Sequence, residues 1–288
     1  MLNAQLAVGI TEALAGALGG ASKIDDLQRL GGGFSRNFRL RWGGQAVFLK
    51  LASAELLEAE ADGLRALAQC TALRVPQVFG CGSAGGGAFL AMEWLALTDS
   101  GSEVCLGEAI AALHEIHYPR YGWDRDNFLG ASPQHNAWCE DWVDFFAARR
   151  LEPQLAWAAA HGAPDLVELA VPLLAGLAQF FPEPPPKALL HGDFWAGNKG
   201  FVGNQPAIFD PAVHVGDPEC DLAMAELFGG FSQDFFAAHA AVHPRKPWHV
   251  ERQALYQLYH ILNHFQLFGG AYAGSARALI ARLLAYLR

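Results

Sequence analysis

The pattern of apolar residues changes near residue 95 of this 288-residue chain, and this change constrains the fold more than any other feature. Before it, apolar and polar residues alternate in short runs, as in Phe38, Leu40 and Trp42, which is typical of half-buried strands. After it, apolar residues recur at helical spacing over long segments. We therefore expect an α+β protein with two lobes, a small antiparallel sheet in residues 1–95 and a larger, mainly helical part in residues 96–288.

The expected elements follow from this pattern. In the first lobe, helices are predicted over residues 1–18 and 53–69, and the second of these is the one helix carried by the sheet. Beyond residue 95, the spacing predicts helices over residues 103–117, 139–160, 164–180, 217–241 and 248–285. Two short apolar runs interrupt these helices and flank the sequence H-G-D-F-W-A-G-N, which begins at His191.

Composition excludes several classes of protein. The chain is 52% hydrophobic and 17% charged, which suits a packed globular protein. Its formal net charge of −9 argues against a nucleic-acid or anionic-membrane surface, because both require a basic face. The five cysteines are scattered without a C-x-x-C pair, which favours reduced thiols. No basic residue precedes Lys23, and no charge-free apolar stretch of about 18 residues could span a bilayer. We expect a cytoplasmic protein without a membrane or nucleic-acid partner.

Glu60 is predicted to point inward from the helix over residues 53–69. The i, i+3, i+4 rule places it on the same face as leucines such as Leu57 and Leu64. An unpaired carboxylate there would be costly, so Glu60 needs a cationic partner. Lys50 ends the strand-like run A-V-F-L-K and is the only lysine between Lys23 and Lys187. A Lys50–Glu60 ion pair is the simplest arrangement, although a glutamate that reaches water is the alternative.

An inward lysine that is fixed by a helix glutamate and preceded by a glycine-rich turn is one half of a nucleotide phosphate clamp. Backbone N–H groups at Gly32 and Gly33 could approach the phosphates. The segment G-G-G-F-S-R-N-F matches no complete phosphate-binding motif, and a hairpin turn explains it equally well.

The second half of such a site is predicted after residue 190. Phosphoryl transfer needs a carboxylate for the acceptor hydroxyl, an amide oxygen for a metal ion and a second carboxylate that bridges the metal to the phosphates. Asp193, Asn198 and Asp210 supply these groups in order. Their oxygen atoms suit Mg²⁺. After Asp210 a helix is predicted within about ten residues. This leaves no room for a peptide-docking segment, so the acceptor should be a small molecule.

The motifs resemble those of a known family. L-L-H-G-D-F-W-A-G-N, I-F-D-P-A-V-H-V-G-D-P-E-C-D-L-A-M-A-E-L-F-G-G-F and L-Y-H-I-L-N-H-F-Q-L-F-G are similar to the fructosamine kinases (ketosamine 3-kinases), which are aminoglycoside phosphotransferase-like enzymes. The resemblance covers about residues 31–269, and it implies a two-lobed protein-kinase-like fold. It also implies transfer of the ATP γ-phosphate to the sugar O3 of ketosamines such as fructoselysine or ribuloselysine. The unstable 3-phosphate then releases the amine, which is a deglycation or repair step.

The resemblance assigns roles to particular residues. It implies Asp193 as the catalytic base, Asn198 and Asp210 as Mg²⁺ ligands, and Lys50 with Glu60 as the holder of the α- and β-phosphates. The residues implied to bind adenine form the M-E-W-L segment, namely Met92, Glu93, Trp94 and Leu95.

The resemblance also bears on the acceptor and on regulation. It implies that Trp195 stacks on the sugar and that His264 bonds to it. Phe34 stands about where many relatives carry a cysteine that forms redox-linked dimers, so regulation by that route should be absent, and we expect a monomer. The partner is a small-molecule ketosamine or a glycated lysine of a protein.

Other interpretations stay open from the sequence alone. Another kinase of the same fold could act on an aminoglycoside, a choline-like molecule or an amino alcohol. A nucleotide-binding pseudokinase is a third reading, but none of the expected clamp or metal residues is missing. His260 and His264 have metal-ligand spacing on a predicted helix. Their apolar neighbours favour a groove lined by imidazoles.

Overall fold

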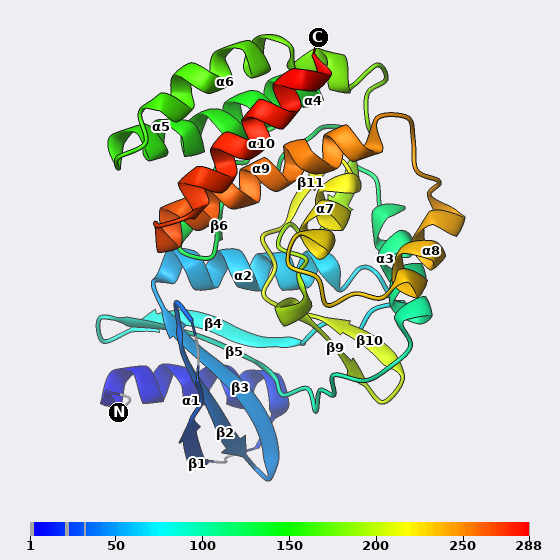
Figure 1. Ribbon diagram of the computed structural model, residues 1–288. Coiled ribbons are helices and arrows are strands. Elements are labelled where there is room, and N and C mark those ends of the chain that lie inside the picture. The colour runs from blue at the N-terminus through cyan, green and yellow to red at the C-terminus, as the bar shows by residue number, and fades with distance from the viewer. Residues whose placement is uncertain (1–2, 21–22, 32, 288) are drawn as a thin grey trace. The chain divides into compact units, whose positions relative to one another are not determined.

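The computed structural model describes residues 3–20, 23–31 and 33–287 (Figure 1). It divides into two compact units. The first unit comprises Met1–Gly101 together with Gly200–Pro211, and the second comprises Ser102–Lys199 together with Ala212–Arg288. The structure thus draws the division at residue 101, where the sequence suggested 95, and it adds a later segment that contains Asp210 to the first unit.

The first unit is built on an antiparallel sheet with strand order β1-β2-β3-β5-β4. Its strands are β1 (Ile24–Arg29), β2 (Arg36–Trp42), β3 (Gln45–Ala52), β4 (Val78–Ala84) and β5 (Gly87–Glu93). In the register of this sheet, Lys50 lies opposite Asn37 on one side and Leu90 on the other. The lysine is therefore carried by a central strand, whose position is fixed by hydrogen bonds along both edges.

Two helices cover opposite faces of this sheet. α1 (Ala4–Leu18) packs its buried Leu6, Ile10 and Leu14 into one cluster with Leu49 and Leu51 of β3. Successive residues of a strand point to opposite faces, so Lys50 points away from α1. It faces α2 (Ala54–Leu67), whose first turn is capped by Ser53.

The later segment of the first unit is the hairpin of β9 (Lys199–Val202) and β10 (Gln205–Ile208). The backbone N–H of Arg74 donates to the carbonyl of Pro206 at 2.7 Å, and the N–H of Ile208 donates to the carbonyl of Arg74 at 3.0 Å. These bonds fix the chain just before Asp210 against residues that precede β4.

The second unit is mainly helical. Its α-helices are α3 (Glu103–His114), α4 (Trp142–Phe146), α5 (Glu152–Ala160), α6 (Asp165–Ala175), α7 (Glu219–Leu227), α8 (Gln233–Val242), α9 (His249–Phe268) and α10 (Tyr272–Tyr286). A π-helical turn, η1 (Ala147–Leu151), joins α4 to α5, and there are two short 3₁₀ turns, η2 (Leu177–Phe180) and η3 (Ala196–Asn198). Its short strands pair as β6 (Asn127–Leu129) with β7 (Ser132–Gln134), and as β8 (Ala188–Leu190) with β11 (His214–Gly216).

Two of the long helices predicted from the sequence are each divided in the structure. The segment 217–241 contains α7 and α8, and the segment 248–285 contains α9 and α10. Paired glycines with positive φ lie at each break, at 71° and 90° for Gly229 and Gly230, and at 64° for both Gly269 and Gly270. Glycine adopts this left-handed conformation without the steric cost of a Cβ, which ends a helix.

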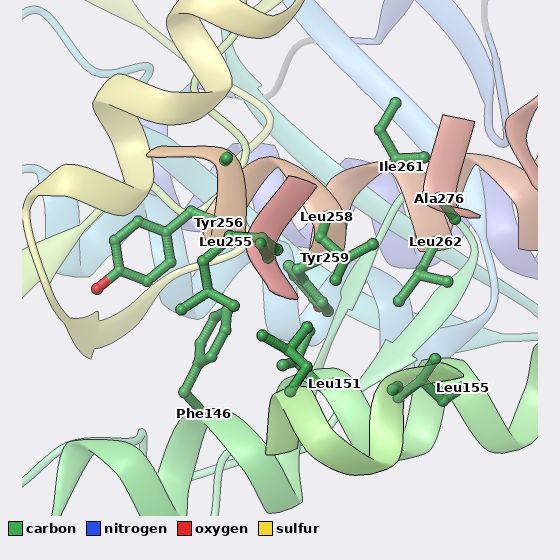
Figure 2. Close-up of a cluster of buried hydrophobic side chains, with 14 of the residues drawn as sticks. Phe146, Leu151, Leu155, Leu255, Tyr256, Leu258, Tyr259, Ile261, Leu262 and Ala276 are labelled. Carbon is green, nitrogen blue, oxygen red and sulfur yellow. The ribbon is translucent and has the colours of Figure 1, made fainter. Parts of the chain in front are cut away.

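The core of the second unit lies around α9. Figure 2 shows Phe146, Leu151 and Leu155 facing residues of α9 such as Leu255 and Leu262, with Ala276 of α10 beside them. This burial on several sides explains why α9 is rich in apolar residues over most of its circumference. No helix in the described ranges combines the length and the apolar character that crossing a membrane requires.

Candidate active site

The predicted Lys50–Glu60 ion pair is present in the first unit. The Lys50 Nζ atom lies 2.6 Å from Glu60 Oε1, and it also contacts the carboxylate of Asp210. Lys50 is 5% exposed and Glu60 is 8% exposed, whereas the side chain of Asp210 is about half exposed at 48%. A single buried ammonium group thus holds two carboxylates, one internal and one open to solvent.

The charges of this cluster shift one another's protonation. Burial by itself would lower the pKa of Lys50, but the adjacent carboxylates of Glu60 and Asp210 outweigh it and raise the pKa. Burial raises the pKa of Glu60 to about 7, with Lys50 acting against the rise and Asp210 adding to it. Lys50 therefore stays protonated, and its ammonium group contacts the half-exposed carboxylate of Asp210.

Asp210 has an unusual backbone conformation. Its φ of 56° lies in the left-handed region, which few residues other than glycine adopt. Strain of this kind persists only where the surrounding structure imposes it, and it often marks functional residues. Here the bonds between β10 and Arg74 end at Ile208, so the turn that follows directs the Asp210 carboxylate to Lys50.

The other residues predicted to bind nucleotide also belong to the first unit. Gly32 lies outside the described residues, and Gly33 is exposed in the β1–β2 connection with no atom within 4 Å of the position that a Cβ would take. Met92 is buried in β5, and Glu93 ends this strand and bonds to Arg74. The exposure of Gly33 is compatible with contact between its backbone N–H group and a phosphate.

The M-E-W-L segment spans the end of β5, which lies at Glu93. Trp94 stacks on Phe48 at 5.9 Å between ring centroids, and the Arg39 guanidinium lies over the Trp94 ring, 4.8 Å from its centroid. Leu95 follows outside the strand, so its backbone groups lie beyond the β3–β5 ladder. Of the four predicted residues, Trp94 and Leu95 therefore lie beyond the end of β5 and outside the β3–β5 pairing.

The H-G-D loop belongs to the second unit, between β8 and β11. His214 pairs with Leu190 in this ladder, and the backbone N–H of Ala212 donates to the carbonyl of His191 at 2.9 Å. Gly192 has a φ of 81°, and a Cβ at this position would lie 2.0 Å from the carbonyl oxygen of Ala212. The loop can therefore pass this close to the neighbouring strand only with glycine at position 192.

Asp193 and Asn198 are held together within this loop. The side-chain amide of Asn198 donates to the backbone carbonyl of Asp193 at 2.8 Å and to its carboxylate Oδ2 at 3.1 Å. The backbone N–H of Asp193 donates to Nδ1 of His191 at 3.2 Å. Asn198 is buried, and Asp193 is half-buried. Asn198 thus orients the carboxylate of Asp193, and His191 holds the backbone of the same residue.

Trp195 lies next to this aspartate and is 41% exposed. Its indole lies over Gly197, where a Cβ would come within 2.3 Å of the ring. The glycine therefore lets a large aromatic surface lie flat on the loop. An exposed indole that is fixed in this way can stack on the face of a sugar.

His264 contacts the connection between α7 and α8, and another residue of this connection contacts the loop. Its ring is 4.7 Å from that of Phe228, and Phe231 of the same connection packs 5.1 Å from Phe194 of the loop. Nδ1 of His264 is 2.8 Å from the carbonyl of His260, so this nitrogen carries the proton and Nε2 is left as an acceptor. Burial lowers the pKa of His264, which favours the neutral ring.

Asp221 supports the site, and the sequence analysis assigned it no role. Its carboxylate accepts the backbone N–H groups of His191 and Gly192, each at 2.8 Å, and Nε2 of His114 at 3.2 Å. Burial opposes ionisation of Asp221, but the bond from His114 is among the interactions that outweigh it and lower the pKa. A buried carboxylate of α7 thus anchors the loop that carries Asp193.

Two buried amides hold the other side of the loop. Asn127 donates to the carbonyl of Val213 at 2.7 Å, and Gln134 donates to that of Ala212 at 3.2 Å. The hydroxyl of Tyr259 in α9 donates to Gln134 at 2.8 Å. The sequence offered no signal for these roles, because β6 and β7 are too short to show a periodic pattern.

Each unit carries a side chain whose oxygen atoms suit a hard cation. Asp210 has carboxylate oxygens in the first unit, and Asn198, whose side-chain nitrogen donates to Asp193, has an amide oxygen in the second. Within the described ranges, no group of three or more His, Cys, Asp and Glu side chains is arranged to hold a metal ion. A Mg²⁺ ion that is held by one or two protein side chains usually takes its other oxygen ligands from water and substrate phosphates.

Comparisons with known proteins show the family to which the chain belongs. A family model described as fructosamine kinase matches residues 7–286. A probable ketoamine kinase of Synechocystis is 38% identical over 287 residues, which are 96% of each chain. The probable ketoamine kinase YniA of Escherichia coli K12 is 38% identical over 263 residues, which are 88% of this chain and 91% of the relative.

Solved structures extend the likeness to the fold. A Haemophilus somnus protein provisionally assigned as a fructosamine-3-kinase has a TM-score of 0.88 at 30% identity over 96% of both chains. The aminoglycoside phosphotransferase APH(4)-Ia, in a complex with ADP and hygromycin B, has a TM-score of 0.63 at 18% identity, over 96% of this chain and 98% of that one. At that identity the second likeness concerns the fold alone, and it agrees with the kinase-like α+β architecture.

Proposed function

The chain belongs to the fructosamine kinase family, and we propose that it transfers the γ-phosphate of ATP to the O3 hydroxyl of a ketosamine. The phosphate ester of O3 is unstable, so the amine is released and the adduct is removed. The acceptor is a fructosamine or ribulosamine, either as a small molecule or on a lysine of a protein. This proposal makes the protein a cytoplasmic deglycation enzyme.

Asp193 is the proposed catalytic base. Its Oδ2 is fixed by Asn198, which leaves the carboxylate oriented to accept the proton of the sugar hydroxyl as the new O–P bond forms and the bond to the β-phosphate oxygen breaks. Phosphoryl transfer depends mainly on positioning and charge, and a preset carboxylate supplies both. Trp195 stacks on the sugar, and Nε2 of His264 accepts a hydrogen bond from one of the sugar hydroxyl groups.

Lys50 is the proposed partner of the ATP α- and β-phosphates. Its ammonium is fixed by Glu60 and already contacts the half-exposed Asp210. Gly32 and Gly33 approach the phosphates through their backbone, and the segment from Met92 to Leu95, with Glu93 and Trp94, holds the adenine. Asp210 and Asn198 are the proposed ligands of Mg²⁺, which when bound neutralises charge that develops on the phosphate oxygens.

The observation that carries the proposal is the H-G-D-F-W-A-G-N loop. It combines a positioned carboxylate with a fixed, 41% exposed indole two residues later, so one loop offers both a base and a sugar-stacking surface. The family match over residues 7–286 supports the assignment of the acceptor class.

The test is ATP consumption with matched acceptors. We expect turnover with fructoselysine or ribuloselysine in the presence of Mg²⁺, and none above background with sorbitol-lysine, which lacks the keto group. A panel of aminoglycosides, choline and ethanolamine serves to detect the other acceptor classes of this fold. Turnover with one of these and none with either ketosamine would contradict the proposal.

A further inference from the structure

Aromatic side chains from three segments of the second unit gather around His264. Measured between ring centroids, His264 lies 4.7 Å from Phe228 and 5.5 Å from Phe268. Tyr272 lies 5.2 Å from His264 and 6.4 Å from Phe268. Phe228 follows α7, Phe268 ends α9 and Tyr272 begins α10. We call the set of Phe228, His264, Phe268 and Tyr272 the aromatic patch.

Two rings of the aromatic patch are open to solvent. Phe228 is 44% exposed and Phe268 is 60% exposed, whereas other phenylalanines of this unit, such as Phe194 and Phe235, are fully buried. Burial of a whole aromatic side chain removes about 150–250 Å² from water, so a bound group that covers these rings gains apolar contact. Exposed apolar side chains that lie next to one another commonly mark a binding surface.

The connection between α7 and α8 joins the aromatic patch to the H-G-D loop. A Cβ at Gly230 would lie 2.5 Å from the Cβ of Ala196, and Phe231 packs 5.1 Å from Phe194. Ala196 and Phe194 both belong to the loop, so the connection lies directly against it. Phe228, two residues before Gly230, belongs to the aromatic patch. The patch therefore lies beside the loop that carries the proposed base.

The chemistry of the aromatic patch favours some ligands over others. Its phenylalanines carry no charge, and burial lowers the pKa of His264, which keeps this ring neutral at pH 8. Aromatic rings stack on apolar and aromatic groups, and their faces also attract an ammonium group. A ketosamine combines a sugar, a secondary ammonium group and an amine substituent. The last two of these are groups that such rings attract.

We propose that the aromatic patch binds the amine substituent of the ketosamine and selects acceptors whose substituent is apolar or aromatic. This inference rests on the proposed function, in which Trp195 and His264 hold the sugar. A substituent that extends from the sugar past His264 meets the rings that surround this histidine. The patch therefore determines which adducts are preferred, whereas the H-G-D loop carries out the reaction on all of them.

Two adducts test this preference. The fructose adducts of phenethylamine and ethylamine share the sugar and the secondary amine, and they differ by one phenyl ring. Initial rates of ATP consumption should show turnover of both, with kcat/KM about tenfold higher for the phenethylamine adduct, because its ring is covered by the patch. Equal values of kcat/KM would overturn this inference and leave the proposed function standing. No turnover of either adduct would contradict the proposed function, and this inference with it.

Three variants locate the preference. Phe268→Ala removes the most exposed ring of the patch and should bring the ratio of the two kcat/KM values close to 1, whereas Phe268→Tyr keeps the ring and should keep the ratio. Trp248→Ala is the matched control, since Trp248 is 45% exposed at the opposite end of α9, and it should leave the ratio unchanged.

The ratio separates binding of the substituent from general damage, because a loss of folded protein or of the chemical step affects both adducts equally. A ratio that persists in Phe268→Ala would overturn the proposal and would assign the exposed rings to another occupant, such as a second copy of the chain. A ratio that falls equally in Trp248→Ala would also overturn it, because the preference would then not depend on the patch.

Discussion

Asp193 depends on its neighbours for its orientation. The Asn198 amide bonds to its carboxylate Oδ2 at 3.1 Å, and Nδ1 of His191 accepts its backbone N–H. Both partners lie within five residues of Asp193, so these two bonds form within the loop itself. A short local motif can therefore carry the base of the proposed reaction, and the rest of the fold needs only to hold the loop in place.

Asp193→Asn should lower kcat by about 10²–10⁴-fold, the usual effect of losing a positioned general base. The amide cannot accept the hydroxyl proton, whereas the proposed nucleotide-binding residues are unchanged. Steady-state kinetics with a ketosamine, together with calorimetric titration of ATP, measure the two effects separately. Asp25→Asn, at an exposed position of β1, is the control and should keep full activity. Activity near the wild-type level in Asp193→Asn would exclude this residue as the base.

Gly192→Ala should destabilise the protein more than Gly162→Ala. Both glycines have positive φ, at 81° and 100°, so alanine introduces backbone strain of about 1–3 kcal/mol at either position. At position 192 the new Cβ also meets the Ala212 carbonyl, whereas nothing lies within 4 Å of it at position 162. Urea unfolding of the two variants gives the difference in free energy. Equal losses would mean that the loop can move away from Ala212 at no cost.

At the scale of elements, the Lys50–Glu60 pair ties β3 to α2. Lys50→Met should cost about 3–5 kcal/mol of unfolding free energy, because it leaves a buried carboxylate without its cation. The loss should grow as the pH rises above about 7. Lys50 lowers the pKa of Glu60, which is about 7 with the lysine present, so removing Lys50 raises this pKa further and the variant goes on losing stability at a pH where the wild type no longer does.

Controls separate the ion pair from the loss of a lysine. Lys187→Met removes a lysine whose side chain is 29% exposed, and should cost less than about 1 kcal/mol. Adding Glu60→Met to Lys50→Met should recover part of the stability, because it removes the unpaired charge. Urea unfolding that shows equal losses for the two lysine variants would contradict a stabilising role of the pair.

The sequence was informative where a local pattern carried the signal. Helical periodicity places Glu60 among leucines, where its carboxylate needs a cation. The strand-like run that ends at Lys50 indicated which residue supplies this cation. The breaks at Gly229–Gly230 and Gly269–Gly270 were not predicted, although the glycines are plain in the sequence, because apolar spacing continues on both sides. The bond between His114 and Asp221 joins residues 107 positions apart, and no local pattern indicates such a contact.

At the scale of the whole molecule, buried histidines should make the protein sensitive to acid. Burial lowers the pKa of His214, His239 and His260 to about 3. Unfolded histidines bind protons below pH ~6.5, so each of the three reduces stability by up to about 1.4 kcal/mol per pH unit as the pH falls from there towards 3. Glu60 and Asp217, with pKa values raised to about 7 and about 6, act in the opposite sense between about pH 4 and 7.

The net result should be a shallow loss of stability from pH 6.5 to 5 and a steep loss below about pH 4.5, where the two carboxyl groups no longer compensate. Urea midpoints at pH 8, 6, 5 and 4 measure this profile. His260→Gln should flatten the steep part, and His117→Gln, at an exposed position, should leave it unchanged. Stability that stays constant between pH 5 and pH 4 would contradict the neutral state of the buried imidazoles.

The family, the two lobes and the ion pair followed from sequence motifs, and each nucleotide or acceptor role stays a prediction. What the sequence could not provide was the support of the H-G-D loop by Asp221, Asn127 and Gln134, because these bonds depend on how α7 and the β6–β7 hairpin pack. The residues that do the proposed chemistry are local in sequence, whereas those that hold them are distant.

The central claim is that this chain phosphorylates O3 of a ketosamine, and the position of the phosphate in the product tests it most directly. Phosphorus–proton correlation NMR of a reaction with fructoselysine, ATP and Mg²⁺ should connect the new phosphorus signal to the proton on C3, followed by release of free lysine. The signal should be absent with Asp193→Asn. A phosphorus coupled to any other carbon's proton, or no phosphorylated sugar with active ATP turnover, would contradict this account.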